Sequence, residues 1–486
     1  MITLPPSYKG RKVGVLGLGR SGLAAARALE DAGAVPICWD DGEGGRAAAA
    51  ALGLRMENLA SQRTWEGEDA PQMLIVSPGI PHLYPAPHPA VRCAWAAGAP
   101  VDNDVGLFFE AWAETDFDDY DDAPKIICVT GSNGKSTTTA LIAHLLTEAG
   151  RHAQAGGNIG RAVFDLEIPD DGGVVVLELS SYQTELARRL APDVACFINL
   201  SPDHLDRHGG EGGYFAAKAR LFTLGAPEVA VVGTDQEEGL FLADRCLGQG
   251  GQVVRVASGR KPSGLGREVV ARKGFLSETR GGKQTSSVDL RGCRALQGAH
   301  NHQNAAIAWA ACRSLNIPPK VLEKGLHSFP GLPHRMERVG EAGGVLFVND
   351  SKATNADAAE KALGAYDKVR WILGGVPKAG GIDPLRPLFG KVAKAYLIGE
   401  AAGLFAQTLG HAVEHDFSET LEAALDRAAA EALPGEVVLL SPACASFDQF
   451  QSFEARGDAF RARAQALIAA QGGALEGAGQ ETKGAA

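Results

Sequence analysis

The feature that most limits the fold is a repeated order of apolar run, glycine-rich or polar turn, and helix-like segment. The run "KVGVLGLG" leads into "SGLAAARALEDAG", which has helical spacing and stops at Gly33. Two further apolar runs, "VPICWD" and "MLIVSPG", keep the same order. Strands that alternate with helices form parallel sheets, and such sheets bind ligands at the carboxyl ends of their strands. The pattern therefore predicts an α/β fold.

The length of 486 residues leaves room for roughly three domains of about 150 residues each. The acidic stretch "ETDFDDYDDAP" precedes the apolar run "KIICVTG", and a further set of strands starts near "GLPHRMERV". The glycine- and basic-rich region from Gly259 to Lys283 is expected to be an insertion or a hairpin. We therefore predict a Rossmann-like N-terminal domain over residues 1–110, a central P-loop-type ATPase domain over 111–333, and a Rossmann-like C-terminal domain over 334–486.

Composition excludes several classes of partner. The net charge of −11 argues against nucleic-acid binding, which normally needs a basic surface. The N-terminus lacks the basic and apolar regions of a signal peptide, and no apolar run is long enough to span a membrane. The eight cysteines form no C-x-x-C pair, so we expect buried free thiols rather than zinc sites or disulfides. These features predict a cytoplasmic protein with no membrane partner, which we expect to be a monomer.

The first glycine-rich loop runs from Gly17 to Gly22, with Asp40 ending the next strand about 20 residues later. Gly17 allows a tight turn, Gly19 lets a phosphate approach the backbone, and the following helix N-terminus favours an anion. The pattern fits an NAD site. It also fits a nucleotide sugar, which carries the same pyrophosphate, or a tight turn without a ligand.

The second loop lies in "IICVTGSNGKSTTTALIAHLL", between a strand that ends at Thr130 and a helix that begins near Lys135. Its glycines are closer together than in the usual P-loop, which has four residues before Gly-Lys-Ser/Thr. Backbone N–H groups from Gly131 to Lys135 can still surround an anion, and the Ser136 hydroxyl is placed for Mg²⁺. We therefore predict an ATP site rather than a structural turn. A second nucleotide loop also weakens a dehydrogenase interpretation.

Candidate metal ligands follow two later strands. Glu178 ends "VVVLE" and His204 follows "VACFINL", so both are expected at the same sheet edge as the phosphate loop. The alternative is that His204 is an ordinary core or surface residue. His204 and His208 could also form an i, i+4 zinc pair, although Gly209 and Gly210 argue against a long helix there. In the last region, Ser446 is expected to begin a helix, where it could hold a carboxylate or serve as an N-cap.

Five stretches taken together resemble the Mur ligases of peptidoglycan synthesis, and among them the members that add D-glutamate. They are "GSNGKST", "GGNIG", "ELSSYQTE", "NDSKATN" and "SPACASFDQF". The resemblance extends from about Lys12 to Gly457. It implies that the short spacing of the phosphate loop is a variant typical of this family. It implies ATP, Mg²⁺ and a CO₂-derived lysine carbamate as cofactors. It also implies that UDP-N-acetylmuramoyl-L-alanine and D-glutamate are joined through an acyl phosphate, with UDP rather than NAD at the first loop.

The resemblance also implies roles for individual residues. The catalytic positions are Lys135, Asn158, His204 and Lys218. The ATP-binding positions are Gly131, Ser132, Asn133, Gly134, Lys135, Ser136, Thr137, Asn301, Asn304, Arg335 and Asp350. The nucleotide-substrate positions are Gly19, Arg20, Ser21, Asp40, Gly79 and Asn158. The D-glutamate positions are Thr354, Lys378, Ser446, Phe447 and Phe453. The metal positions are Ser136, Glu178, His204 and Lys218 as its carbamate.

Three alternatives remain open at this point. The chain could be another amide ligase of the same family, adding a different amino acid or adding glutamate to folate. It could be an NAD-dependent enzyme with a regulatory ATP site. It could also be a nucleotide-binding switch with no catalytic activity. Phosphate release from ATP with each candidate amino acid distinguishes the ligases, and NADH oxidation without ATP use would indicate the dehydrogenase.

Overall fold

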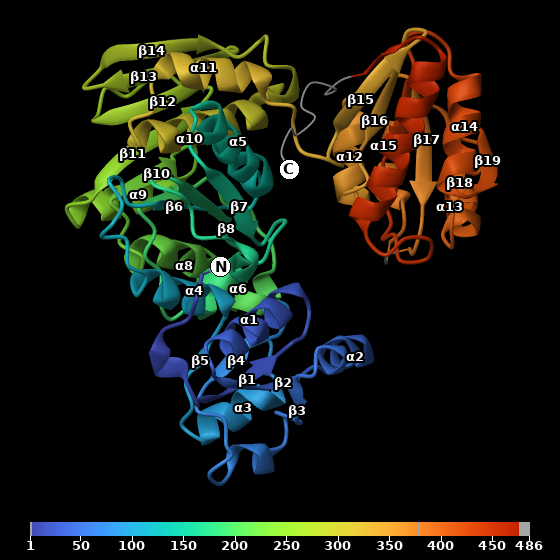
Figure 1. Cartoon of the computed structure of the whole chain (residues 1–486). Coiled ribbons are helices and arrows are strands. Elements are labelled where there is room, and N and C mark those ends of the chain that lie inside the picture. Colours follow the sequence, from blue (N-terminus) through green and yellow to red (C-terminus); the bar gives the residue numbers. More distant parts are fainter. Residues whose placement is uncertain (1, 378–379, 476–486) are drawn as a thin grey trace. The chain divides into compact units, whose positions relative to one another are not determined.

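The chain forms two compact units, Met1–Phe329 and Pro330–Ala486, each described here by itself. The computed structural model describes residues 2–377 and 380–475. Lys378, predicted to bind D-glutamate, therefore lies outside the described residues. Figure 1 shows helices packed around sheets throughout the chain, as an α/β fold requires.

The first unit begins with a parallel five-stranded sheet in the order β3-β2-β1-β4-β5. Its strands are β1 (Lys12–Leu16), β2 (Val35–Trp39), β3 (Arg55–Met56), β4 (Leu74–Val76) and β5 (Val101–Asp102). Its helices are α1 (Arg20–Asp31), α2 (Glu43–Ala51), α3 (Pro89–Ala96) and α4 (Asp104–Ala113), with short 3-10 turns at η1 (Pro6–Tyr8) and η2 (Gln62–Trp65). The connection from β1 to α1 is the first glycine-rich loop.

A second sheet of nine strands fills the rest of the first unit, in the order β14-β13-β12-β11-β10-β9-β6-β8-β7. It is parallel from β7 to β12 and antiparallel at β13 and β14. Its strands are β6 (Lys125–Thr130), β7 (Ala153–Gly157), β8 (Val174–Glu178), β9 (Val194–Phe197), β10 (Val229–Gly233), β11 (Gln252–Ser258), β12 (Arg267–Arg272), β13 (Phe275–Arg280) and β14 (Lys283–Asp289). Because β6 and β8 lie inside a covered parallel sheet, they are almost wholly apolar and buried.

Helices cover both faces of this second sheet. They are α5 (Lys135–Glu148), α6 (Ser181–Leu186), α7 (Leu205–His208), α8 (Glu211–Thr223), α9 (Glu237–Gly248), α10 (Ala299–Ser314) and α11 (Pro319–Ser328), with 3-10 turns at η3 (Val163–Asp165) and η4 (Arg294–Leu296). Helix α6 starts directly after β8 because Ser180 and Gln183 form a capping box. That cap places the start of α6 beside the end of β8.

The second unit holds a seven-stranded sheet in the order β19-β18-β17-β20-β16-β15-β21. Its strands are β15 (Glu337–Ala342), β16 (Val345–Asn349), β17 (Val369–Gly374), β18 (Val392–Ile398), β19 (His415–Glu419), β20 (Val437–Leu440) and β21 (Ala474–Leu475). Its helices are α12 (Ala356–Gly364), α13 (Ala402–Leu409), α14 (Leu421–Glu431) and α15 (Phe453–Ala470), with a 3-10 segment at η5 (Asp383–Lys391). The sheet is parallel from β19 to β16, and β15 pairs antiparallel with both of its neighbours.

The α/β prediction is confirmed, including the apolar strands on which it rested. The region from Gly259 to Lys283 contains the antiparallel pair β12–β13, as the hairpin prediction required. The unit boundary after Phe329 lies near the predicted division at 333/334, whereas the predicted division at 110/111 falls within α4. The three-domain division at these residue numbers stays a prediction.

The cysteines behave as the sequence indicated. All eight are free, and seven of them are buried, with Cys93 partly exposed. Within the described ranges, no helix combines the length and the apolar character needed to cross a membrane.

Candidate active site

Three neighbouring strands of the nine-stranded sheet bring the candidate residues to one edge. Strand β6 lies between β9 and β8, and all three run parallel. Their carboxyl ends therefore lie side by side, with Thr130 ending β6 and Glu178 ending β8. The loop after β9 leads to His204. The predicted shared edge for Glu178, His204 and the phosphate loop is therefore confirmed.

The phosphate loop makes its short turn through two glycines with positive φ. Gly131 has φ 151° and Gly134 has φ 83°, a left-handed conformation that favours glycine. A Cβ on Gly134 would clash with Asn304 Oδ1, so a side chain is also excluded by space. Helix α5 begins at the next residue, Lys135, whose Nζ donates to the carbonyl oxygens of Gly131 (3.0 Å) and Ser132 (2.9 Å). The loop thus presents a helix N-terminus and a cation together, which suits a phosphate group.

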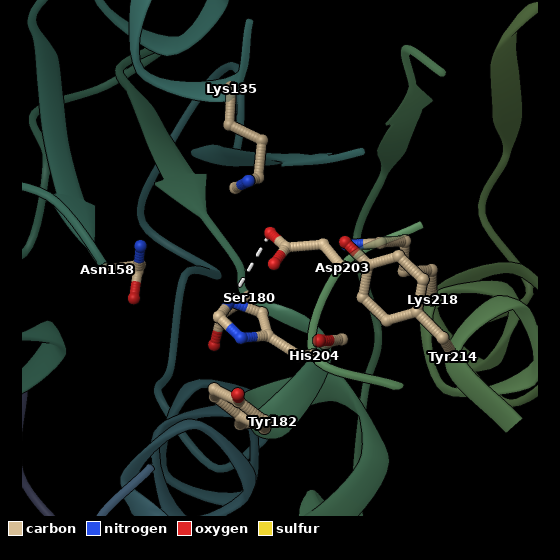
Figure 2. Close-up of a pocket in the computed structure, with 9 residues that line it drawn as sticks. Lys135, Asn158, Ser180, Tyr182, Asp203, His204, Tyr214 and Lys218 are labelled. Carbon is tan, nitrogen blue, oxygen red and sulfur yellow. Dashed lines mark ion pairs between the residues drawn. The ribbon is translucent and has the colours of Figure 1, made fainter. Parts of the chain in front are cut away.

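A pocket of about 140 Å³ opens beside this loop (Figure 2). It draws residues from β6–α5, β7, β8–α6, the β9–α7 loop and α8, and the lining consists of Lys135, Asn158, Ser180, Ser181, Tyr182, Asp203, His204, Tyr214 and Lys218. The four predicted catalytic residues, Lys135, Asn158, His204 and Lys218, all line it. Residues separated by more than 80 positions in sequence are thereby brought to one small space.

Lys218 is buried on α8, with 1% of its surface exposed. Its Nζ donates to Gly131 O at 2.9 Å and lies 4.4 Å from the centre of the Tyr214 ring. Burial, assisted by the positive charge of Lys135, lowers the pKa of Lys218 to about 7. Lys218 is therefore not a surface lysine, although it lies on a helix.

Glu178 has the character expected of a cation ligand. It is 2% exposed, and its Oε1 accepts a hydrogen bond from Asn158 Nδ2 at 2.8 Å. Its Oε2 is buried and has no hydrogen-bond partner among the described residues. A buried carboxylate oxygen without a partner is costly, and a bound cation would satisfy it. The residues present therefore fit a magnesium ion.

The other predicted metal positions lie at the same edge of the sheet, after β6 and β9. Ser136 is on the first turn of α5, and His204 is the left-handed residue (φ 51°) that precedes the four-residue helix α7. His204 Nε2 lies 3.4 Å from Asp203 Oδ2, the contact dashed in Figure 2. Over the described part of the chain, no three His, Cys, Asp or Glu side chains converge on one point. Both ring nitrogens of His208 face other side chains, with Nδ1 3.2 Å from Glu185 Oε1 and Nε2 2.9 Å from Ser181 Oγ, which argues against the zinc pair. Mg²⁺ keeps waters and takes phosphate oxygens, so it needs few protein ligands.

Sequence reasoning missed several lining residues. The sequence motifs assign no role to four of them, Ser180, Tyr182, Asp203 and Tyr214. Tyr182 lies in "ELSSYQTE" with its ring 5.1 Å from that of His204. Tyr214 lies one helical turn before Lys218, and its hydroxyl is 3.1 Å from Ser132 Oγ. The i, i+4 spacing of Tyr214 and Lys218 on one helix face was the available signal.

The predicted ATP residues divide between the two units. Asn304 adjoins the phosphate loop at Gly134, and its Nδ2 donates to Asn301 Oδ1 at 3.3 Å. Arg335 and Asp350 belong to the second unit. Asp350 accepts from Ser441 Oγ (2.9 Å), and burial raises the pKa of its carboxyl to about 7 despite that hydrogen bond.

The first glycine-rich loop is built around Asp40. Its two carboxylate oxygens accept from Leu18 N (2.6 Å) and Gly42 N (2.7 Å), so Asp40 holds the loop while closing the end of β2. Gly17 has φ 87°, and a Cβ there would lie within 3 Å of Ser77 and Ile80. Arg20 and Ser21 open helix α1, and a Cβ on the N-cap Gly19 would meet nothing within 4 Å. An incoming phosphate could therefore approach Gly19.

Two further residues complete the surroundings of the first loop. Gly79 O accepts from Arg207 Nη1 at 3.1 Å, which links it to the loop of His204. Asp104, at the start of α4, is 3% exposed, and neither carboxylate oxygen has a hydrogen-bond partner in the described chain. Burial raises the pKa of Asp104 to about 6, against the effect of the nearby Ser21 hydroxyl.

The predicted D-glutamate residues that are described all lie in the second unit. Thr354 lies between β16 and α12, and Phe453 begins α15. Phe447 is 73% exposed, whereas Ser446 is buried. The expectation that Ser446 begins a helix is wrong, because residues 447–449 form a turn and the N-cap of α15 is Ser452. Ser446 is thus not a helix N-cap.

Comparison with known proteins agrees with this site. The pattern described as the Mur ligase middle domain matches residues 129–312, and the Mur ligase glutamate ligase domain matches residues 334–444. UDP-N-acetylmuramoylalanine--D-glutamate ligase from Cereibacter sphaeroides is 59% identical over 462 residues, covering 95% of this chain and 98% of the relative. The protein of the same name from Ruegeria pomeroyi is 57% identical over 460 residues, with coverages of 94% and 98%. The chain belongs to the Mur ligase family.

Solved structures of Mur ligases share the fold. UDP-N-acetylmuramate-alanine ligase from Thermotoga maritima has a TM-score of 0.55 at 18% identity, covering 94% of this chain and 99% of that one. UDP-N-acetylmuramoyl-L-alanyl-D-glutamate--2,6-diaminopimelate ligase also gives a TM-score of 0.55, at 19% identity, covering 79% of this chain and 89% of that one. Mur ligases of different names thus share this α/β architecture with little sequence in common, and the predicted family resemblance is confirmed.

Proposed function

We propose that this chain is an ATP-dependent ligase that joins D-glutamate to UDP-N-acetylmuramoyl-L-alanine during synthesis of peptidoglycan precursors. The observation that carries the proposal is the convergence of Lys135, Asn158, His204 and Lys218 on one pocket beside a phosphate-binding loop. The identity of 56–59% to relatives named as D-glutamate ligases supports this substrate over the other amino acids added within the family.

The first step activates the carboxylate of the L-alanyl group. A carboxylate is a poor acyl donor because its leaving group would be oxide. In the proposed step, a carboxylate oxygen attacks the γ-phosphorus of ATP, the bond to the β–γ bridging oxygen breaks, and ADP leaves with that electron pair. The N–H groups of the loop and the ammonium of Lys135 face the phosphate-binding space, where they offset the negative charge that builds up on the transferred group.

Asn158 and His204 are proposed to orient the reacting carboxylate. Both line the pocket, and Asn158 is itself held by Glu178. Glu178, Ser136, His204 and the Lys218 carbamate would hold Mg²⁺. When bound there, the ion would offset the negative charge of the phosphate groups. No additional protein carboxylate is needed if phosphate oxygens and water complete its shell.

Lys218 is proposed to carry a carbamate. With a pKa of about 7, a large share of its amine is neutral near physiological pH. The amine lone pair attacks the carbon of CO₂, one N–H proton goes to solvent, and an anionic carboxylate remains on nitrogen. The carbamate keeps one N–H, so the hydrogen bond to Gly131 O can persist. The change replaces a buried cation by an anion beside the proposed metal ligands.

The second step forms the amide. The amine of D-glutamate attacks the acyl carbon, a tetrahedral intermediate forms, the amine loses a proton, and phosphate leaves. Thr354, Ser446, Phe447, Phe453 and Lys378 are proposed to bind the amino acid. Ser446 and Thr354 supply hydroxyl donors for its carboxylates. The nucleotide end of the other substrate is proposed to bind at Gly19, Arg20, Ser21, Asp40 and Gly79.

The decisive experiment measures phosphate release from ATP with UDP-N-acetylmuramoyl-L-alanine and one amino acid at a time. We expect turnover that requires D-glutamate and yields the dipeptidyl nucleotide by mass spectrometry. Turnover with another amino acid would instead identify a different ligase of the family. NADH oxidation without ATP use would overturn the proposal. Because the reaction uses cytosolic nucleotides and needs no second copy of the chain, we also propose a cytoplasmic location and a monomer.

A further inference from the structure

A carboxylate lies between two buried histidines beneath the pocket. Glu185 Oε2 is 3.2 Å from His82 Nε2, and Glu185 Oε1 is 3.2 Å from His208 Nδ1. The His208 side chain is fully buried, and the other two side chains are at most 14% exposed. His82 Nε2, Glu185 Oε2 and His208 Nδ1 have no hydrogen-bond partner among the described residues, so each depends on this arrangement. We call these three residues the His82–Glu185–His208 bridge.

The bridge joins three segments that are far apart in sequence. His82 lies on the loop that follows β4, Glu185 lies on α6, and His208 ends α7. The β4 loop belongs to the five-stranded sheet, whereas α6 and α7 belong to the nine-stranded sheet. All three segments lie within the first compact unit. The bridge therefore connects the loop after β4 of the five-stranded sheet to helices α6 and α7, which follow strands of the nine-stranded sheet.

Each joined segment also contains or directly follows an expected site residue. The β4 loop carries Gly79, α6 follows Glu178 at the end of β8, and α7 is preceded by His204. A second contact reinforces the connection, because Arg207 Nη1 donates to Gly79 O at 3.1 Å. The proposed nucleotide-substrate loop and the loop of His204 are thus held together at two points.

The bridge also reaches the pocket through Tyr182. The His208 ring stacks on the Tyr182 ring, with 5.2 Å between centres and 14° between planes. Tyr182 lines the pocket beside His204, as Figure 2 shows. On its other side, His208 Nε2 lies 2.9 Å from Ser181 Oγ, and Ser181 is also a pocket residue. Displacement of His208 would therefore disturb two walls of the pocket.

Metal binding and simple stabilisation do not account for this arrangement. No cluster suited to a metal is found at these residues or elsewhere in the described ranges. Buried charged groups add little net stability compared with well-packed apolar side chains, but they do impose one geometry. Burial alone would raise the pKa of Glu185, yet the contacts with His208 and His82 outweigh burial and lower it to about 2, so its carboxylate is charged. The bridge is best suited to fixing register between loops.

We propose that Glu185 is a positioning residue that, through His82 and His208, aligns the loop of His204 with the loop that receives the nucleotide end of the substrate. Binding of that remote end then helps to place the reacting carboxyl group in the pocket. Binding energy from a part of the substrate that does not react can be used in this way to raise kcat. The inference rests on the proposed function.

The test combines an enzyme variant with a shortened substrate. Glu185→Ala and Glu185→Gln are compared with the unmodified chain on UDP-N-acetylmuramoyl-L-alanine and on its 1-phosphate analogue, which lacks the uridylyl group. For Glu185→Ala we expect kcat on the full substrate to fall about a hundredfold, with the KM for ATP unchanged. The advantage of the full substrate over the analogue should shrink by about tenfold. Glu185→Gln, which keeps the size of the side chain, should recover part of the loss.

Asp165→Asn is the matched control, because Asp165 Oδ1 pairs with Arg27 Nη2 at 3.1 Å and also links the two sheets, but away from the pocket. It should behave like the unmodified chain on both substrates. Equal losses on full and shortened substrates in Glu185→Ala would overturn the proposal, as would wild-type kcat.

Hydrogen exchange gives a readout independent of turnover. In Glu185→Ala, amides of residues 79–84 and 203–209 should both exchange faster, while His82→Asn should affect mainly residues 79–84. Unchanged exchange in both loops would overturn the bridge even if ligation is observed. Faster exchange in a chain that does not ligate D-glutamate would support the bridge while the proposed function fails.

Discussion

The first unit contains two glycine-rich loops of the same construction with opposite electrostatic surroundings. Each joins a buried parallel strand to a helix, β1 to α1 and β6 to α5. The first is held by the carboxylate of Asp40, and the buried carboxyl of Asp104 lies at the start of α4 near Ser21. The second is held by the ammonium group of Lys135, which donates to the carbonyl oxygens of Gly131 and Ser132. The two strand–loop–helix connections thus differ both in charge and in the conformation of the N-cap residue, which is extended at Gly19 and left-handed at Gly134.

The ligands proposed for the two loops account for this difference. Phosphates that react need cations nearby, because charge increases on them in the transition state. A nucleotide that is only held can be bound by backbone N–H groups and a helix N-terminus, with a carboxylate available for hydroxyl groups. In both places burial favours the neutral form of a side chain, because it raises the pKa of Asp104 and lowers the pKa of Lys218.

The largest effect is expected for Lys135→Ala, which removes the cation of the second loop. Because Lys135 offsets charge on the transferred phosphoryl group, kcat should fall roughly 10²- to 10³-fold. Arg20→Ala, the matched change at the start of α1, should act mainly on the KM for the nucleotide substrate. Steady-state kinetics on both variants measure the contrast. If Arg20→Ala lowers kcat as much as Lys135→Ala does, the two loops do not have different roles.

Lys218→Ala should lose roughly a hundredfold in turnover, the size of effect expected when a group that supports a metal is removed. The variant should still fold and bind ATP. Acetate at high concentration should restore part of the activity by supplying the missing carboxylate, and it should not help Lys135→Ala. Near-full activity of Lys218→Ala in bicarbonate-free buffer would rule out the carbamate.

Asp40→Asn tests the first loop. Asparagine offers one neutral acceptor oxygen where the carboxylate offers two charged ones, so either Leu18 N or Gly42 N loses its acceptor and the other keeps only a neutral one. The loss is worth about 2 kcal/mol, and we expect roughly a 30-fold rise in the KM for the nucleotide substrate. The KM for ATP is the internal control. A matching rise there would mean that Asp40 acts on the whole unit rather than on its own loop.

The smallest effect is a pH dependence of stability set by Asp104. Its pKa is raised from about 3.9 in the unfolded chain to about 6, so the folded state binds more protons between these values. The contribution of Asp104 is therefore fully present below about pH 4 and is lost as pH rises through about 6. The free energy of unfolding, relative to that of Asp104→Asn, should fall by roughly 1–2 kcal/mol from pH 4 to pH 8. Urea unfolding across this range measures it, and parallel profiles would contradict a buried carboxyl at this position.

Much of the fold could be predicted from sequence because its causes are local. Buried parallel strands are continuous apolar runs, and glycines mark the turns that need positive φ, as at Gly131 and Gly134. The catalytic positions Lys135, Asn158, His204 and Lys218 were instead implied by the resemblance of their motifs to a known family. Ser446 shows the limit, since it was expected to begin a helix, whereas the backbone forms a turn there and α15 begins at Phe453.

The sequence by itself determined the order of strands and helices, the two loops and the family, because each depends on neighbouring residues and their spacing. The tertiary structure decided which of those residues meet. The burial of Lys218, the buried carboxylate oxygen of Glu178 that lacks a partner, and the bridge from His82 through Glu185 to His208 all involve contacts between segments that sequence spacing does not relate. A pKa or an ion contact depends on the solvent excluded and the charges nearby, and these exist after the sheets have packed.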